Sequence, residues 1–252
     1  PGFFGGLVMG HALRRAASQR IGGFDPLAVG WTHAYWAEGP EFVALGLSDG
    51  GAVATWPDEI GTDDLTQSTA GLRPTYRTAG TINSVPAVRG DGTQYYRDVA
   101  FASAMAQPHS TVVITRLTSV AGTWATIIDG TSNARAWLAV RVSGTLNWNL
   151  FAGGGVAQAG TPAANTGHLL RAFFSGSSSL LDVNGTNVVP TGTAVGTQNR
   201  GGISLFNTSV QLGQLAVVAG DIAFVGVFNG DVTGDPKWAQ FKTWVTSHYG
   251  IT

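Results

Sequence analysis

The carboxylates in this sequence are not spaced for hydrolysis of a glycosidic bond. That reaction generally needs two carboxyl groups about 5–9 Å apart, one as the acid and the other as nucleophile or base. The glutamates are Glu38, Glu41 and Glu59, all in the first quarter of the chain, and they form no such pair on one strand. The later aspartates are isolated and stand mostly in turn sequences. The sequence therefore predicts that the chain is not an enzyme.

Three other kinds of reactive or binding motif are also missing from the sequence. No G-x-S-x-G motif follows a predicted strand, so a serine nucleophile elbow is not expected. The glycines at 153–155 are not followed by a helix, as a phosphate-binding loop requires. The histidines lack the H-x-H and H-x₃-H spacings of zinc sites. These histidines are His11, His33, His109, His168 and His248.

The aromatic residues are the material from which a sugar site can be built. The chain contains 8 Trp and 5 Tyr. A sugar ring stacks on an aromatic face while a few polar groups fix its orientation. Large aromatics also fill the interior of β-sandwiches, so core packing is the alternative for the same residues. The candidates for glycan binding are Tyr95, Tyr96, Trp124 and Trp148.

Composition excludes several classes of partner. Charged residues make up only 12% of the chain and the net charge is −1, so the basic surface that binds nucleic acid is missing. No apolar run reaches the roughly 18–20 residues that span a bilayer, so membrane insertion is not expected. There is no cysteine to form a disulfide or a thiolate metal site. A surface with so little charge suits packing against other protein copies, and we expect a homo-oligomer.

Short strands dominate the sequence from residue 24 onward. A β-branched run covers residues 111–117, and residues 137–142 and 146–151 form a predicted hairpin. Asn184-Gly185 is the strongest hairpin signal, because a type I′ turn needs positive φ at both central residues. Strands at intervals of about 10–15 residues, separated by turn residues, predict a two-sheet antiparallel sandwich.

One helix is predicted, at about residues 235–249. Asp235 can cap its first turn, Pro236 suits the first helical position, and Gly250 suits the left-handed position after the last turn. The apolar residues recur at helical spacing and predict one face packed on the core. They are Trp238, Phe241, Trp244, Val245 and Tyr249.

Residues 1–23 differ from the rest and are predicted to form an N-terminal arm, separate from a single domain at 24–252. The arm is rich in glycine and apolar residues. A floppy leader and an arm docked onto a neighbouring subunit are both open alternatives. Its apolar run at residues 3–9 precedes a group of arginines, the reverse of a secretory signal, so we expect no signal peptide. The predicted contact residues are Phe3, Phe4, Leu7 and Leu13.

A series of motifs between residues 31 and 92 resembles the N-terminal third of laminin-G-like, concanavalin A-like jelly rolls. The series consists of V-x-x-W-x-D-x-x-G at 53–61, an R-P pair, and N-x-x-P-x-V-x-x-D-G at 83–92. The hairpin at 182–185 and the terminal Tyr-Gly also resemble that family. Its signature residues are Trp56, Asp58, Arg73, Pro74, Asn83, Asp91 and Gly92. The resemblance implies an all-β jelly-roll sandwich with one C-terminal helix and an N-terminal extension.

We expect the signature residues to act as scaffolding. Trp56 should fill the gap between the sheets, and Asp58 should cap the turn before Gly61. Arg73, held extended by the following proline, should reach a carboxylate such as Asp58 or Asp91.

A calcium site is one further implication of the resemblance, since domains of this type often hold one ion at the sandwich rim. Its candidate ligands are Asp129, Asn133 and Asp182. Ordinary Asp-Gly turns are the alternative, and no other cofactor is expected.

Domains of this family occur in bacteriophage particles and in large bacterial surface proteins. The resemblance, the low charge and the arm together predict a virion subunit, either a minor tail protein or a capsid decoration protein. Such a subunit would be made in the host cytoplasm and bound to other virion proteins through the arm. Contact with a cell-surface glycan is an additional option. The alternatives are a carbohydrate-binding adhesin without a virion role and, more remotely, a glycoside hydrolase of the same fold.

Overall fold

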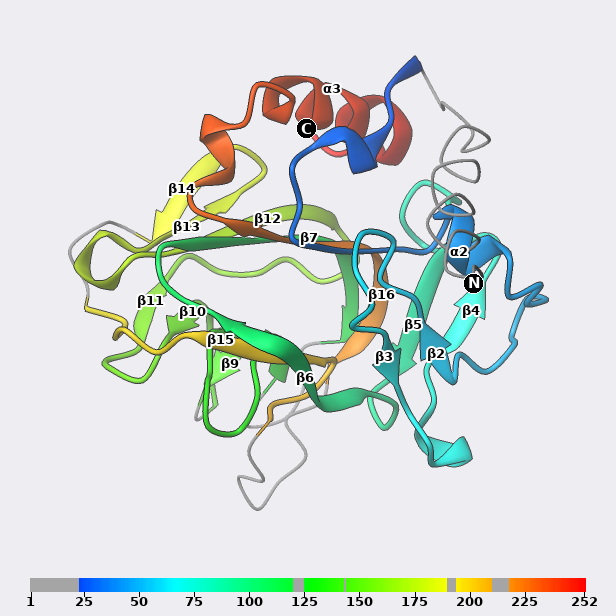
Figure 1. Ribbon diagram of the computed structural model, residues 1–252, viewed down its shortest axis with the longest axis horizontal. Helices are drawn as coiled ribbons and strands as arrows, with labels where there is room; N and C mark the ends of the chain where they lie inside the picture. Colours follow the sequence, from blue (N-terminus) through cyan, green and yellow to red (C-terminus); the bar gives the residue numbers. More distant parts are fainter. Residues whose placement is uncertain (1–22, 120–124, 143, 190–193, 210–217) are drawn as a thin grey trace, which may run out of the picture.

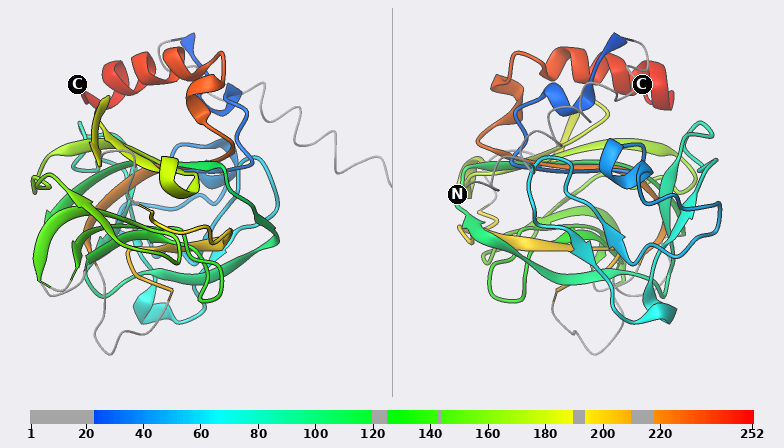
Figure 2. Two further views of the ribbon diagram at one scale, coloured as in Figure 1. Left: turned by 90° about the vertical axis from the view of Figure 1, so that its left-hand side faces the viewer. Right: turned by 45° about the vertical axis from the view of Figure 1, so that its right-hand side comes forward.

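Two large antiparallel sheets are stacked face to face, and a helix covers the outer face of one of them (Figure 1). This computed structural model describes residues 23–119, 125–142, 144–189, 194–209 and 218–252. The helix, α3 (Trp238–Tyr249), runs across the sheet that contains strands β7, β12 and β16. Figure 2 shows the same three layers in two further views.

The larger sheet has eight strands in the order β14-β13-β12-β7-β16-β5-β4, with β1 also paired to β16. Its strands are β1 (His33–Trp36), β4 (Thr75–Arg77), β5 (Ala87–Asp91), β7 (His109–Ser119), β12 (Gly167–Phe174), β13 (Leu180–Val183), β14 (Thr186–Val189) and β16 (Ala219–Asn229). The long central pair of β7 and β16 joins segments that lie about a hundred residues apart in the chain.

The second sheet has six strands in the order β11-β10-β9-β8-β15-β6. They are β6 (Tyr96–Met105), β8 (Ala125–Asp129), β9 (Trp137–Val142), β10 (Thr145–Phe151), β11 (Ala157–Ala159) and β15 (Arg200–Leu205). A small sheet pairs β2 (Thr55–Trp56) with β3 (Leu65–Thr66). The short helices are η2 (Pro26–Ala28), α2 (Pro40–Val43), η3 (Ala70–Leu72), η4 (Gly176–Ser178) and η5 (Val232–Gly234).

The central strands of the eight-stranded sheet are buried on both faces, which explains their long apolar runs. In β7, Val113 points into the core between the sheets, whereas Val112 and Ile114 point toward α3. In β16, Val225 points into the core between the sheets and Phe224 points toward α3. Strands covered on both sides read as nearly continuous apolar runs, because neither face meets water.

Helix α3 confirms the predicted C-terminal helix but begins three residues later than expected. The carboxylate of Asp235 accepts the backbone N–H of Lys237 at 2.7 Å and that of Gly30 at 3.0 Å. Asp235 therefore shapes the turn that precedes the helix and does not cap its first turn. Gly250 ends the helix in the left-handed conformation, with φ of 66°, as predicted.

The hairpin prediction at Asn184-Gly185 is confirmed. Asn184 has φ of 52° and Gly185 has φ of 83°, the signs that a type I′ turn requires. The turn joins β13 to β14 and leaves Asn184 on the same side of the sheet as α3, where both line one groove.

The signature residues lie in the core or hold turns and loops of the first part of the chain in place. Trp56 is fully buried against Tyr35, Phe42 and Tyr96. Asp58 accepts the N–H of Ile60 at 3.1 Å and so caps its turn.

The remaining signature residues hold nearby loops. Asp91 accepts the N–H of Thr93 at 2.8 Å, and Gly92 follows with φ of 96°. Asn83 donates to the carbonyl of His248, and Pro74 accepts the N–H of Val53.

The prediction for Arg73 is wrong. Its guanidinium donates to two backbone carbonyls, those of Gln67 at 2.9 Å and Ser68 at 2.9 Å, and it pairs with no carboxylate in the described part of the chain. The reason is local, because the 3-10 turn η3 brings these carbonyls closer to Arg73 than either predicted aspartate. The predicted all-β sandwich with one C-terminal helix is nonetheless confirmed.

Glu59 is a buried carboxylate that holds the start of α2. It accepts the backbone N–H groups of Glu41 and Phe42, each at 3.0 Å. Burial raises the pKa of the Glu59 carboxyl from its ordinary value of 4.5 to about 7, although the two backbone hydrogen bonds oppose this shift. The native protein therefore binds a proton at Glu59 more tightly than the unfolded chain does.

This shift predicts a pH-dependent stability. Between pH 4.5 and about 7 the folded state holds the proton that the unfolded state has lost, so the free energy of unfolding falls as the pH rises through this window. The slope from one group reaches at most about 1.4 kcal/mol per pH unit. Urea titrations at pH 5, 6 and 7 should show that Glu59→Gln has a shallower dependence than the wild type. Parallel curves for the two proteins would contradict the prediction.

Candidate functional site: a polar groove beside helix α3

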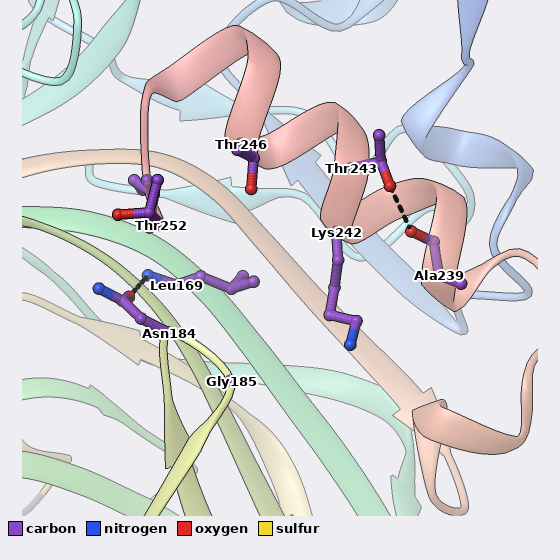
Figure 3. Close-up of a pocket in the computed structure, with 9 residues that line it drawn as sticks. Leu169, Asn184, Gly185, Ala239, Lys242, Thr243, Thr246 and Thr252 are labelled. Carbon is purple, nitrogen blue, oxygen red and sulfur yellow. Dashed lines mark hydrogen bonds between the residues drawn. The ribbon is translucent and has the colours of Figure 1, made fainter.

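A groove of about 450 Å³ lies between α3 and the edge of the eight-stranded sheet formed by β12 and the β13–β14 hairpin (Figure 3). Helix α3 contributes its outward face and the sheet contributes the turn at Asn184-Gly185. The lining residues are Leu169, Asn184, Gly185, Ala239, Lys242, Thr243, Thr246, Ile251 and Thr252. We call this part the lysine compartment.

A second hollow of about 330 Å³ adjoins the first and shares Asn184, Ile251 and Thr252 with it. Its other lining residues are Thr81, Ile82, Asn83, Arg116, Asn165, Thr166, Gly167, Tyr249 and Gly250. We call this part the arginine compartment. The two compartments share three lining residues and are therefore neighbours, and we refer to them together as the groove.

Local structure orients the polar groups of the lysine compartment. The side-chain oxygen of Asn184 accepts the N–H of Leu169 at 2.8 Å, which leaves the amide nitrogen as a donor (Figure 3). The Thr243 hydroxyl donates to the carbonyl of Ala239 at 3.1 Å. Lys242 extends from the helix toward the sheet, and Thr246 stands one turn further along.

A row of charged side chains crosses the sheet at the arginine compartment. Arg89 of β5, Asp221 of β16 and Arg116 of β7 are direct cross-strand neighbours, and Gly167 of β12 follows in the same row. Asp221 is fully buried, and its Oδ1 forms an ion pair with Arg89 Nε at 2.6 Å. Burial raises the pKa of Asp221, but hydrogen bonds from Arg89 and Thr81 outweigh it and hold the pKa below its ordinary value.

The arrangement suits binding of a ligand rich in hydroxyl groups. The residues that line the two compartments supply threonine hydroxyls, asparagine amides and two cations, and they include no Asp or Glu. Such groups offer donors and acceptors for sugar hydroxyls. The groove itself contains no carboxyl pair of the kind that cleaves glycosidic bonds.

The structure corrects the glycan-binding residues predicted from the sequence. Tyr95, Tyr96 and Trp148 are all buried in the core between the sheets. Tyr96 donates its hydroxyl to the carbonyl of Val53 at 2.9 Å. No ring face of these three residues is open to a ligand, because sandwiches use large aromatics to fill their interior. Trp124 lies outside the described residues.

The three predicted calcium ligands are not brought together. Asp129 is in the six-stranded sheet, Asp182 is in the eight-stranded sheet, and Asn133 is exposed in a turn. The Asp129 carboxylate is occupied by the guanidinium of Arg135 at 2.8 Å. Asp182 faces Arg171 at 3.5 Å. In the described part of the chain, no cluster of three or more His, Cys, Asp or Glu side chains has the arrangement of a metal site.

The assembly residues predicted in the arm, Phe3, Phe4, Leu7 and Leu13, lie outside the described residues. Sequence reasoning also missed the groove. One signal for it was present, because Lys242, Thr243 and Thr246 form the polar face opposite the apolar stripe of α3. The position of Arg116 in the groove could not be predicted from the sequence, because it depends on the pairing of strands from distant parts of the chain.

No protein-family model and no curated protein matches the sequence. Among solved structures, Trypanosoma rangeli sialidase in complex with 2,3-difluoro-KDN matches 98% of this chain and 40% of its own, with a TM-score of 0.57 and 10% identity. Domain 4 of AbnA, a GH43 extracellular arabinanase from Geobacillus stearothermophilus, in complex with arabinotriose, matches 62% of this chain and 75% of its own, with a TM-score of 0.48 and 12% identity. Mouse laminin alpha1 chain, domains LG4-5, matches 54% of this chain and 40% of its own, with a TM-score of 0.37 and 15% identity.

These neighbours correct one prediction. The chain was expected not to be an enzyme, but sialidases share its fold over nearly its whole length. The fold therefore does not support the prediction that this chain lacks enzymatic activity. At 10% identity the similarity establishes the fold alone, and the chain spans about two fifths of the length of the sialidases that it matches.

The membrane prediction concerns helices only. Within the described ranges, no helix combines the length and the apolar character that a membrane span needs.

Proposed function

We propose that this chain is a carbohydrate-binding module of the laminin-G-like β-sandwich fold, and that its ligand binds in the groove beside α3. The observation that carries the proposal is the groove itself, where hydroxyl, amide and cationic groups from α3, β12 and the β13–β14 hairpin converge. Convergent polar groups in a concave site are what fixes the orientation of a small ligand.

The mode of binding follows from which side chains are exposed. In the described part of the chain, the exposed large apolar residues are Val43 and Leu45, and neither is aromatic. Stacking of a sugar on an exposed aromatic ring is therefore not the basis of the proposal. Hydrogen bonds from Asn184, Thr246 and their neighbours in the groove are its basis.

Glycan binding by the full chain tests this proposal. We expect the wild type to bind members of a glycan array, and Thr246→Val to weaken that binding by roughly 2–10-fold, the effect of one hydrogen bond. Thr233→Val, which alters an exposed threonine outside the groove, is the matched control and should bind like the wild type. Equal binding by both variants, or no binding by the wild type, would contradict the proposal.

We further propose that the module is a subunit of a bacteriophage virion, as a minor tail or capsid decoration protein. The low proportion of charged residues, 12%, and the motif series at 53–92 support this proposal. In such a particle, residues 1–23 would contact neighbouring virion proteins, the subunit would be a homo-oligomer, and the groove would meet host-surface glycans.

Mass spectrometry of purified particles from the source phage tests the virion role. The chain should be present in the particle, and an antibody against it should label one structure there. Its absence from intact particles would refute the virion role and leave the glycan-binding proposal standing.

A further inference from the structure

The groove beside α3 carries positive charge that the described part of the chain does not neutralise. Lys242 of the lysine compartment is exposed, and Arg116 of the arginine compartment is partly buried. In the described residues, Arg116 has a backbone carbonyl, that of Thr81, as its hydrogen-bond acceptor. Neither cation lies within ion-pair distance of a described carboxylate, in contrast to Arg89 at 2.6 Å from Asp221.

The row of charged residues across the sheet explains why Arg116 pairs with no carboxylate of the described residues. In its cross-strand neighbour Asp221, Oδ1 accepts a hydrogen bond from Arg89 Nε at 2.6 Å and Oδ2 accepts one from Arg89 Nη2 at 2.9 Å. The Thr81 hydroxyl also donates a hydrogen bond to Oδ2, at 2.7 Å. The three charged residues, Arg89, Asp221 and Arg116, therefore sum to one positive charge, which lies at the arginine compartment.

Arg116 lines a hollow with room for a ligand, the arginine compartment of about 330 Å³. Its neighbour in β12 is Gly167, and the side chains of Ile251 and Ile82 lie over that glycine and form part of the wall of the hollow. Its Nε is buried without a hydrogen-bond partner. A guanidinium withdrawn from water is costly unless an anion and hydrogen bonds compensate for the lost hydration. The nearby amides of Asn83 and Asn165 offer further donors to such an anion.

We propose that the groove selects acidic saccharides, with an oxyanion of the ligand at Arg116 and a second negatively charged or strongly polar group at Lys242. This inference rests on the proposed glycan-binding function and names its ligand class. A planar guanidinium fits both carboxylate and phosphate oxygens, so the shared chemistry is a sugar that carries an oxyanion. A polyuronate and a sugar-phosphate polymer are its two sources.

Three kinds of probe on one array of immobilised oligosaccharides test this inference with the full chain. They are oligogalacturonates and other uronate oligomers, the same oligomers as neutral methyl esters, and oligomers linked through phosphate. We expect the chain to retain acidic probes and to bind the neutral esters at least tenfold more weakly, and an increase in NaCl should weaken the acidic binding. Retention of uronates or of phosphate-linked oligomers identifies which source supplies the oxyanion.

Variants that remove one positive charge show which residues bind the acidic saccharide. Lys242→Gln should reduce binding of the acidic probe roughly tenfold, as expected for the loss of one charge-assisted contact. Lys237→Gln, on an exposed lysine that does not line the groove, is the matched control and should have no effect. Arg116→Gln should reduce binding further, and Arg116→Lys should restore part of it. A thermal melt of each variant shows whether it is folded.

The outcomes separate this inference from the proposed function. Neutral esters bound as tightly as the acids, or acidic binding that Lys242→Gln and Lys237→Gln reduce equally, would overturn the acidic ligand class and leave glycan binding intact. No binding of any saccharide, neutral or acidic, would overturn both.

Discussion

Replacement of Asp221 with asparagine is expected to lower the free energy of unfolding by about 3–5 kcal/mol, the usual cost of removing one partner from a buried ion pair. Asp221 is fully buried. Its carboxylate accepts hydrogen bonds from the Arg89 guanidinium and from both the backbone N–H and the hydroxyl of Thr81. An amide in its place would carry a donor group toward other donors and leave the charge of Arg89 uncompensated.

The pH dependence of this effect has a definite sign. The pKa of Asp221 is lowered in the folded protein, so its stabilisation is complete above the ordinary carboxyl pKa of 3.8 and is lost as the pH falls through the lowered value. The difference in unfolding free energy between wild type and Asp221→Asn should therefore be largest near neutral pH and shrink in acid. Urea titrations at pH 7 and pH 3 measure it.

Asp49→Asn is the matched control for this prediction. Asp49 also pairs with an arginine, Arg77 at 3.2 Å, but its side chain is 46% exposed. Solvent screens such a pair, so the loss should be below about 1 kcal/mol. Equal losses for the two variants would show that burial of Asp221 does not determine its contribution.

Replacement of Phe241 with alanine is expected to destabilise the protein by about 3–5 kcal/mol, as large-to-small substitutions of buried aromatics do. Phe241 is fully buried at the centre of the layer between α3 and the sheet. Its ring contacts Trp31 at 5.5 Å and Phe224 at 5.4 Å between centroids. It also contacts Trp238 and Trp244 of its own helix.

The same substitution should affect the groove, since Phe241 joins α3 to the sheet. Loss of its ring removes contacts that hold the helix against β16, and Lys242 and Thr246 depend on the position of that helix. Relative to the wild type, Phe241→Ala should increase the rate of amide hydrogen exchange more in α3 than in β7. Gln240→Ala, on the exposed face of the same helix, is the control and should change stability by less than about 0.5 kcal/mol. Unchanged exchange in α3 of Phe241→Ala would contradict the prediction.

Elements that depend on neighbouring residues were predictable from the sequence. The turn at Asn184-Gly185 requires positive φ at two adjacent positions, and these residue types accept it. The apolar stripe of α3 and the glycine after it likewise follow from helical spacing and from the left-handed φ of Gly250. The sandwich class followed from the succession of short strands and from a motif series that spans many residues.

The prediction that certain aromatic rings are exposed to a ligand failed for the candidates that the structure describes. Residue type marks Tyr96 and Trp148 as large aromatics, but only the stacking of two sheets decides that both are interior. The partners of Arg73 likewise depend on the path of the backbone before it, because the turn η3 places backbone carbonyls within hydrogen-bond distance of the Arg73 guanidinium.

The sequence by itself determined the hairpin turn and the closing helix, because each rests on interactions between residues close in the chain. It also indicated the class of fold, through the succession of short strands and the motif series. Only the tertiary structure decided the groove. Arg116, Asn184 and Lys242 are far apart in the sequence, and they line one surface because β7, β12 and the β13–β14 hairpin pair in one sheet beneath α3. The charge left on Arg116 is decided in the same way, because Asp221 lies opposite both arginines and its carboxylate accepts hydrogen bonds from Arg89.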